Sequence, residues 1–515
     1  METLLNLPPT RLALLLLTLT LTSILLLTRL HRVHTRRQFA QQHGCKPITH
    51  YSNKDPILGL DEIYRGITTA KRHQALESIT QRFQQHGHTF ASRRLLKYII
   101  VTIEPENIKT ILSTRFRDYG LAHRRPIFQP LLGEGIFDTD GAHWAASRAL
   151  IRPNFTKDQV ADLAAFEALI PALLAHIPRD GATAVDLQDL FFRYTIDSAT
   201  DFLFGQSVGS LTMQRSELDF AAAFNYAQEA MTVRAILGPF GRFYYDKKAE
   251  QCNRICREFA LPFVDEAVRA VRDGGSGSGR GSGARARKTE KYVFSHELAS
   301  RTSDQRRILD ELMNVLLAGR DTTASLLSNM FFMLAKHPAV WAKLRTEVVT
   351  ALEGRLPSYE ELRGLRYLRC CVNESLRLHP VVPMNDRVAV RDTVLPVGGG
   401  PDGRAPVFVP QDTIVAYNVY AMHRRRDFYG DDADVYRPER WEDGRLQPRW
   451  EYLPFNGGPR ICIGQQYALT EVAYVTVRLA QEFAGLESRD PGPWEESLTL
   501  TVCSRNGTRV CLTPA

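Results

Sequence analysis

A single cysteine in a glycine-rich turn is the clearest chemical feature of this 515-residue sequence. The turn reads Phe455-Asn-Gly-Gly-Pro-Arg460-Ile-Cys462-Ile-Gly464. Glycines let the backbone curl so that N–H groups point at the sulfur, and such donors stabilise a metal-binding thiolate. A helix predicted over 465–483 directs its positive N-terminal end at the same sulfur. Phe455 can shield the sulfur from water, and Arg460 can pair with a carboxylate on a ligand's rim.

This turn resembles the haem-binding signature of cytochromes P-450, Phe-x-x-Gly-x-Arg-x-Cys-x-Gly, at every fixed position. The alternative, a buried structural cysteine in a glycine-rich turn, does not account for that match. The resemblance implies that Cys462 is the axial ligand to the iron of haem b. It also implies that Phe455, Arg460 and Gly464 bind this cofactor.

Two later segments predict a charged network, in the order found in the family. Glu374 and Arg377 share one face of a predicted helix and can pair, although such pairs are often surface features of little energetic weight. Pro438-Glu-Arg440-Trp441 resembles the family's second segment, with Trp441 where Phe is commoner. The resemblance implies that Arg440 joins Glu374 and Arg377 in a structural lock of the haem-side core.

A long predicted helix contains the sequence Ala318-Gly319-Arg-Asp321-Thr322-Thr near its middle. Glycine in a helix interior costs about 1 kcal/mol relative to alanine, and Asp and Thr compete for backbone hydrogen bonds. The plain alternative is a solvated helix face. The resemblance implies that Ala318 and Gly319 open a groove for dioxygen and that Asp321 and Thr322 are catalytic proton donors. Because Ala318 replaces the haem-linking Glu of animal fatty-acid ω-hydroxylases, we expect non-covalent haem.

Trp144 and Arg148 form a further pair, four residues apart. The indole N–H and the guanidinium are both donors, which suits a carboxylate. They resemble the family's helix that binds a haem propionate. Arg124 and Arg387 are weaker candidates for the same role.

Helical patterning dominates the rest of the chain. Apolar residues recur at helical spacing from about 308 to 335, and a second helix is predicted over 365–378. Strand-like sequence follows over 388–415, in which the glycine-rich run 398–403 predicts a hairpin turn. The Gly/Ser-rich stretch at about 273–289 predicts a flexible loop.

The N-terminus predicts one transmembrane helix at about 12–28. Those 17 residues carry no charge and as a helix would span about 26 Å, close to the thin core of the endoplasmic reticulum membrane. Four arginines follow within 29–37, so the positive-inside rule places the body in the cytosol. A cleaved signal peptide is the alternative, but no small-residue cleavage site follows. We predict an anchor with a basic flank over 1–37 and one catalytic haem-thiolate domain over 38–515.

The resemblance implies the family's fold for that domain, mainly α with a small β region. The composition, 44% hydrophobic and 24% charged, is ordinary for a globular protein. The eight cysteines include no CxxC pair and no spacing that suits a structural zinc. The net charge of +8 is compatible with nucleic acid, an anionic membrane face or an acidic partner. We expect no nucleic acid, because the resemblance relates the basic excess to docking of an acidic reductase.

Several phrases resemble the fungal alkane- and fatty-acid-hydroxylating branch of the family. They are residues 135–141, 200–205, 314–323 and 395–400. That resemblance implies hydroxylation of a hydrophobic substrate, a long aliphatic chain, in the endoplasmic reticulum membrane. Electrons would come from NADPH-cytochrome P-450 reductase, with cytochrome b5 as a further candidate partner.

Other functions remain open at this point. One is an oxidative tailoring enzyme of a fungal secondary-metabolite pathway. A peroxide-rearranging enzyme of the same fold would typically lack the Asp321-Thr322 pair, and a non-catalytic haem sensor would not need it.

Overall fold

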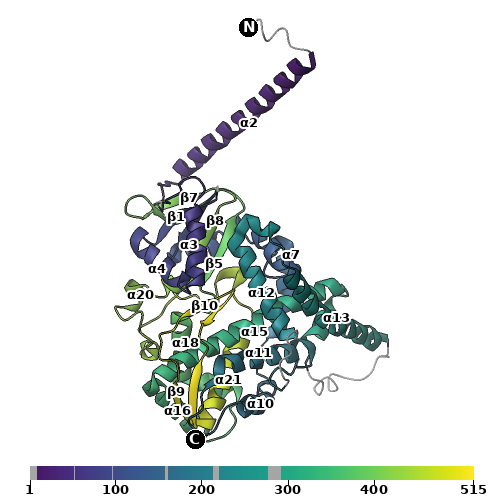
Figure 1. Cartoon of the computed structure of the whole chain (residues 1–515), viewed down its shortest axis with the longest axis vertical. Coiled ribbons are helices and arrows are strands. Elements are labelled where there is room, and N and C mark those ends of the chain that lie inside the picture. The colour runs from purple at the N-terminus through teal and green to yellow at the C-terminus, as the bar shows by residue number, and fades with distance from the viewer. Residues whose placement is uncertain (1–8, 52, 96, 157–160, 213–219, 277–291) are drawn as a thin grey trace.

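The computed structural model describes residues 9–51, 53–95, 97–156, 161–212, 220–276 and 292–515. Helices fill most of the molecule, and the largest sheet lies at the end from which α2 projects (Figure 1). The α-helices are α2 (Pro9–Gln42), α3 (Leu60–Lys71), α4 (Ala75–His86), α5 (Pro105–Lys109), α6 (Arg125–Leu132), α7 (Gly141–Ile151), α9 (Ala164–Glu167), α10 (Ile170–Ala175), α11 (Leu187–Phe204), α12 (Phe220–Leu237), α13 (Lys247–Ser276), α14 (Phe294–Arg301), α15 (Gln305–Lys336), α16 (Pro338–Leu352), α17 (Tyr359–Gly364), α18 (Arg366–Leu378), α19 (Val419–Met422), α20 (Arg426–Tyr429) and α21 (Gln465–Glu482).

The strands form small sheets. They are β1 (Thr89–Arg94), β2 (Lys97–Thr102), β3 (Tyr119–Gly120), β4 (Val185–Asp186), β5 (Met384–Ala389), β6 (Thr393–Gly399), β7 (Ala405–Val409), β8 (Ile414–Asn418), β9 (Phe483–Ser488), β10 (Glu496–Leu498), β11 (Val502–Ser504) and β12 (Arg509–Pro514). The largest sheet has the order β1-β2-β8-β5-β3, with β2 and β8 parallel. A three-stranded sheet has the order β4-β12-β9, and β6-β7 and β10-β11 are two-stranded.

Short 3-10 or π turns connect these elements. They are η1 (Thr110–Thr114), η2 (Phe116–Asp118), η3 (Ala122–Arg124), η4 (Arg152–Phe155), η5 (Gly238–Phe243), η7 (Pro438–Trp441) and η8 (Gly458–Arg460). The mainly α fold with a small β region agrees with the prediction.

The predicted elements around the chemical residues are confirmed. The helices α15, α18 and α21 cover the stretches predicted as helical. Gly399 pairs with Ala405 across the antiparallel hairpin β6–β7, so the run 398–403 is a turn and not a phosphate loop.

The N-terminal helix is longer than predicted. It runs from Pro9 to Gln42, so the predicted boundary at residue 37 falls inside a continuous helix. No Gly or Pro interrupts the chain between Pro9 and Gly44, where φ is +65°, and each added residue of an existing helix gains a backbone hydrogen bond. Among the described residues, this is the one helix long and apolar enough to cross a membrane.

The predicted Gly/Ser loop begins later than expected. Residues 273–276 belong to the last turn of α13, so their assignment to a loop was wrong. Propagating a helix through glycine costs only about 1 kcal/mol per residue. The part of the predicted loop beyond Ser276 lies outside the described residues.

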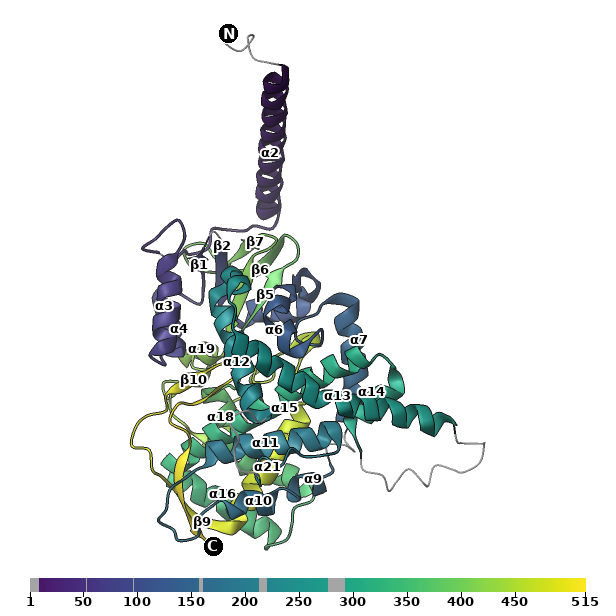
Figure 2. The same cartoon turned by 45° about the vertical axis from the view of Figure 1, so that its right-hand side comes forward.

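Three apolar clusters form the core, and α15 runs through two of them. Its first half packs with α12, α13 and α14, and its second half packs with α11, α16, α18 and α21. The third cluster lies between the largest sheet and the neighbouring helix α4. The helix α15 crosses the middle of the molecule and contacts α21, the helix that follows the cysteine turn (Figure 2).

Candidate active site

Two tight contacts fix the shape of the cysteine turn. Gly458 has φ +67°, and a Cβ there would lie 1.9 Å from the Leu112 carbonyl oxygen, so this position requires glycine. The Cys462 N–H donates to the Phe455 carbonyl at 3.0 Å. The turn leads directly into α21, which begins three residues after the cysteine.

The Cys462 sulfur has the surroundings that a bound thiolate needs. Its side chain is exposed, yet burial by the surrounding protein raises the pKa of the thiol. The sulfur is therefore accessible although protein surrounds it, and we call this accessible side of Cys462 the recess. The Gly464 N–H and the charge of Arg148 both lower the thiol pKa. They stabilise a sulfur anion once burial is compensated by a cation.

The helix α7 presents Trp144 and Arg148 to this recess. The Trp144 indole nitrogen is buried and has no hydrogen-bond partner among the described residues. Burial lowers the pKa of Arg148, and this guanidinium forms no ion pair within the described part of the chain. An unpartnered buried donor beside an uncompensated guanidinium suits a carboxylate brought by a ligand.

Four arginines lie close together beside the recess, namely Arg124, Arg148, Arg387 and Arg460. Burial lowers the pKa of Arg460 to about 10, and the charges of Arg387, Arg124 and Arg148 contribute to that shift. Their described carboxylate neighbours are Asp140, which pairs with Arg460 at 2.7 Å, and Asp386, which pairs with Arg124. Four guanidiniums beside two carboxylates leave a surplus of about two positive charges, which suits a dianionic group. The cluster thus includes Arg124 and Arg387, which the sequence ranked as weak candidates.

Arg460 has protein partners that the sequence did not predict. Its guanidinium donates to Asp140, to the Thr139 carbonyl at 2.9 Å and to the Ile136 carbonyl at 3.3 Å. It also lies over the Trp144 ring at 4.4 Å. Arg460 therefore holds the segment before α7 against the cysteine turn. A cofactor carboxylate would bind this guanidinium in addition to these protein partners.

One face of α15 stays open while the rest of its middle is buried. Val315, Ala318, Gly319 and Thr322 are only partly buried, and their spacing of three and four places them on one face. The Thr322 hydroxyl donates to the Ala318 carbonyl at 2.6 Å. A Cβ at Gly319 would lie 3.6 Å from Ala199 on α11, which is an ordinary van der Waals contact, so the packing of these two helices does not itself require glycine.

Asp321 does not lie on that open face. It is 5% exposed and accepts from Arg320 at 2.9 Å. Burial raises its pKa, opposed by Arg320 and by a hydrogen bond from Gln228 of α12. The structure therefore separates Asp321 from Thr322, because neighbours on a helix point about 100° apart.

Glu374 is the centre of a fully buried polar network. It accepts from the Arg377 side chain twice at 2.9 Å and from Arg440 at 2.8 Å. The backbone N–H of Arg437 and the indole N–H of Trp441 each donate to it at 2.9 Å. Burial alone would raise the pKa of Glu374, but these donors and charges hold it below the ordinary value. The structure thus brings together the three residues that the sequence grouped.

The sequence analysis missed Glu471. This carboxyl on α21 is 1% exposed, and burial raises its pKa to about 8. Its Oε1 has no hydrogen-bond partner in the part of the chain that the structure describes. Its polar neighbours are the hydroxyls of Ser198 on α11 and Thr323 on α15. Glu471 stands among apolar residues in the sequence of α21, and this position could have marked it as a buried carboxyl. Glu471 therefore holds a proton at neutral pH, and it lies beside Thr323, the residue that follows Thr322.

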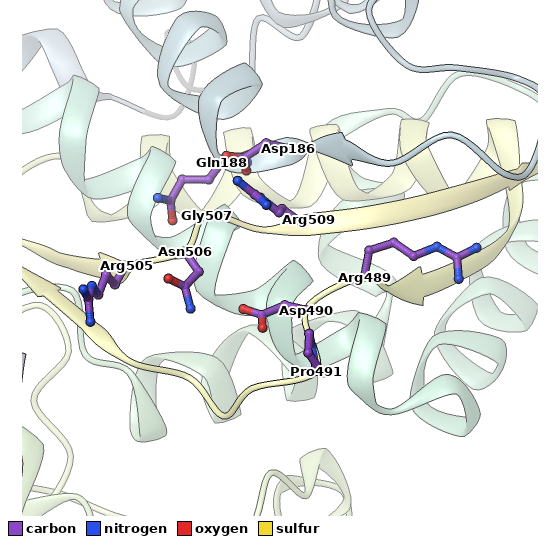
Figure 3. Close-up of a pocket in the computed structure, with 9 residues that line it drawn as sticks. All are labelled: Asp186, Gln188, Arg489, Asp490, Pro491, Arg505, Asn506, Gly507 and Arg509. Carbon is purple, nitrogen blue, oxygen red and sulfur yellow. The ribbon is translucent and has the colours of Figure 1, made fainter.

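A polar surface pocket lies elsewhere in the molecule (Figure 3). It has a volume of about 510 Å³ and contains none of the residues above. Its acids already accept backbone donors, Asp186 from Thr508 and Asp490 from Gly492. The charged and polar lining is not suited to a hydrophobic substrate.

A family model described as Cytochrome P-450 matches residues 63–511. Cytochrome P-450 monooxygenase himC of Aspergillus japonicus is 52% identical over 471 residues, covering 91% of this chain and 84% of that protein. Cytochrome P-450 monooxygenase fsdH of Fusarium heterosporum is 49% identical, with 93% and 85% covered. Cytochrome P-450 52A12 of Debaryomyces hansenii is 41% identical, with 89% and 90% covered.

Proteins of this family bind haem through a cysteine thiolate. The Cys462 recess, the unpartnered Trp144 donor and the surplus positive charge fit that group with its two propionates. The match extends from α3 to β12, and this chain therefore belongs to the cytochrome P-450 family of monooxygenases.

Proposed function

We propose that this monooxygenase hydroxylates a long aliphatic chain, an alkane or a fatty acid. The open face of α15 carries this proposal, because Val315, Ala318 and Gly319 offer a substrate no charge and no polar side chain. Such a face suits a hydrocarbon chain. The resemblance of residues 135–141, 200–205, 314–323 and 395–400 to the fungal alkane- and fatty-acid-hydroxylating branch supports the same substrate class.

The haem, when bound, supplies oxygen activation with electrons from NADPH-cytochrome P-450 reductase. Cys462, Trp144, Arg148 and Gly464 would hold it, with Phe455 and Arg460 supporting the turn. The Thr322 hydroxyl can leave the Ala318 carbonyl and hold a proton at the open face. Asp321 serves as the buried acid behind it, and its release from Arg320 would be required for proton transfer.

A second candidate is an oxidative tailoring enzyme of a secondary-metabolite pathway. The himC and fsdH proteins, at 52% and 49% identity, are more similar to this chain than the 52A12 protein, at 41%. Because these two more similar proteins do not carry the 52A name, we keep this candidate beside the first. The site itself is compatible with any hydrophobic substrate that fits the α15 face.

We propose residence in the endoplasmic reticulum membrane, with α2 as a single-pass anchor and the catalytic domain in the cytosol. The apolar leucines of α2 support this, since Leu25 is 66% and Leu27 is 65% exposed in the structure. Cytochrome b5 would be a second electron donor on the same membrane face. The haem would be non-covalent, because Ala318 offers no carboxyl to form an ester.

A reductase-coupled assay tests the proposal. Full-length protein in microsomes, supplied with NADPH and reductase, should convert an alkane or fatty acid into a hydroxylated product. Conversion of a polyketide panel alone would support the second candidate instead. Cys462→Ser should lose both the product and the carbon monoxide absorption band of thiolate-ligated haem. Retention of either by that variant would overturn the assignment of Cys462.

A further inference from the structure

We propose that Asp138 and Glu311 form a pH-sensitive switch that controls how firmly the protein retains its haem. While both carboxyl groups are protonated, they hold residues 133–140 against α15, and when they ionise this contact weakens. We call the two groups the acid pair, and we call residues 133–140, which join α6 to α7, the connecting segment. The switch acts on the cofactor site and does not depend on which substrate the enzyme hydroxylates.

The connecting segment is fitted closely to the first half of α15. The Glu134 N–H donates to Asp310 Oδ2 at 3.0 Å. A Cβ at Gly133 would lie 1.9 Å from Asp310 Oδ1, and a Cβ at Gly135 would lie 2.3 Å from Asn314 Nδ2. Both positions require glycine, because the backbone of the segment lies directly on polar side chains of the helix.

The other end of the connecting segment is bonded to the cysteine turn. Arg460 donates to the carbonyls of Ile136 and Thr139, and it forms an ion pair with Asp140. The helix α7 begins directly after Asp140, so the segment also positions the two donors that this helix presents to the recess. A shift of the connecting segment away from α15 therefore disturbs the cysteine turn and the α7 donors together.

Glu311 is fully buried on α15 without a group that compensates a negative charge. Neither of its carboxyl oxygens has a hydrogen-bond partner within the described ranges of the chain. Burial raises its pKa to about 7, and the Ser147 hydroxyl on α7 and the Arg307 charge only partly oppose that rise. Asp310 is already paired with Arg257 at 2.7 Å, and its negative charge raises the Glu311 pKa further. The protonated carboxyl is therefore the favoured form at this depth.

Asp138 is the second buried acid and belongs to the connecting segment itself. Its Oδ1 accepts the Gly135 N–H at 2.9 Å, whereas its Oδ2 is buried and has no partner among the residues that the structure describes. Burial raises its pKa to about 6, the Glu134 charge adds to the rise, and the Arg125 charge opposes it. The Asp138 charge also raises the pKa of Glu311, so ionisation of one acid disfavours ionisation of the other.

The pKa values of the acid pair give the direction of the switch. With the segment in place they are about 7 for Glu311 and about 6 for Asp138, against ordinary values of 4.5 and 3.8. Release of the segment admits water and returns both groups toward their ordinary values. Between these limits the docked form binds more protons than the released form, so docking weakens as the pH rises from about 5 to about 7. Above that range the balance changes little.

Haem transfer from the full-length holoprotein to excess apomyoglobin tests the switch. The rate constant of haem loss is measured at about pH 5.5 and about pH 7.5. Glu311→Gln keeps the size of the side chain but cannot ionise, so the ratio of the wild-type to the variant rate constant should rise severalfold over this range. Asp138→Asn should give a smaller rise, because its pKa is less raised. Titration of Cys462 affects all these proteins alike and cancels in the ratio.

A matched control and a local measurement separate the switch from a merely structural role. Glu266→Gln removes an exposed acid of α13, and its rates of haem loss should stay parallel to those of the wild type. Hydrogen exchange of the holoprotein reports on the connecting segment directly. Protection of a peptide that covers residues 133–140, relative to a peptide from α16, should fall with rising pH in the wild type and stay constant in Glu311→Gln.

Two results would overturn the switch while leaving the haem assignment intact. One is a ratio of wild-type to Glu311→Gln rate constants that is the same at both pH values. The other is protection of the connecting segment that changes with pH equally in the two proteins. If Glu311→Gln does not accumulate as holoprotein, the same two criteria decide the matter with Asp138→Asn.

Discussion

Glu374 and Glu471 are equally buried glutamates with opposite ionisation. Glu374 is 0% and Glu471 1% exposed. Glu374 accepts hydrogen bonds from Arg377, Arg440, Trp441 and the Arg437 backbone, and its pKa is held below the ordinary value. Glu471 has only hydroxyl neighbours, and its pKa rises to about 8.

The comparison shows that hydrogen-bond donors and nearby positive charges, and not the depth of burial, decide whether a buried carboxyl is ionised. The donors of Glu374 are two guanidiniums and two N–H groups, which compensate an anion. Hydroxyls such as those of Ser198 and Thr323 can accept as well as donate, so they also suit a protonated acid. One glutamate therefore acts as a charged structural lock, and the other can store a proton on a buried side of α15, beside Thr323.

Breaking the charged centre should have the largest effect. Glu374→Gln removes the anion, which leaves Arg377 buried without a carboxylate partner and Arg440 with Asp432 alone, at 3.3 Å. We expect a cost of about 3–5 kcal/mol. We expect most of the protein to lose its haem, measured as a fall in haem content and in the carbon monoxide band. The surface variant Glu442→Gln loses only an exposed pair with Lys343 and should cost less than about 1 kcal/mol. Equal holoprotein yields from the two variants would disprove the role of Glu374 as a lock.

Replacing Glu471 with glutamine should have a smaller, pH-dependent effect. The folded-state pKa of Glu471, about 8, lies above its ordinary 4.5. Between these values the folded protein binds more protons than the unfolded chain, so the wild-type contribution falls as pH rises. Glu471→Gln lacks this titration. As the pH rises from about 5 to about 8, its Tm should therefore increase relative to the Tm of the wild type.

The measurement is thermal loss of the haem absorption band across that pH range. The contribution of Glu374 runs the other way, since a lowered pKa gives stability that is lost as pH falls below 4.5. Parallel Tm curves for the wild type and Glu471→Gln would contradict a neutral Glu471. The same variant, assayed for the ratio of product to NADPH consumed, reports whether the stored proton is used in turnover.

The local parts of the site could be predicted from the sequence. The cysteine turn needs glycine, Arg and Cys at fixed short spacing, so a ten-residue string carries its geometry. The pairing of Glu374 with Arg377 follows from helix periodicity. The direction of Asp321, away from Thr322, also follows from that periodicity, but its partner Gln228 on α12 does not.

Long-range parts could not be predicted in the same way. Arg124 and Arg387 join Arg148 and Arg460 because η3 and β5 meet beside α7, a result of packing between elements far apart in the chain. The hydrogen bond from Arg36 to Asp392 joins residues 356 positions apart. The sequence treated Arg36 only as part of a basic flank, since a charge run gives no indication of a specific acidic partner.

Trp441→Phe gives the smallest and most selective test of the comparison. The sequence treated Trp441 as a minor departure from Phe, but its indole N–H donates to Glu374 at 2.9 Å. Phe keeps the ring and removes one donor while the others remain, so Glu374 should stay ionised and haem should be retained. We expect a loss of about 1–2 kcal/mol in the free energy of unfolding by urea. If the loss were absent, the guanidiniums alone would suffice to hold the Glu374 charge, and the indole would serve only to pack against Tyr452, whose ring lies 4.9 Å away.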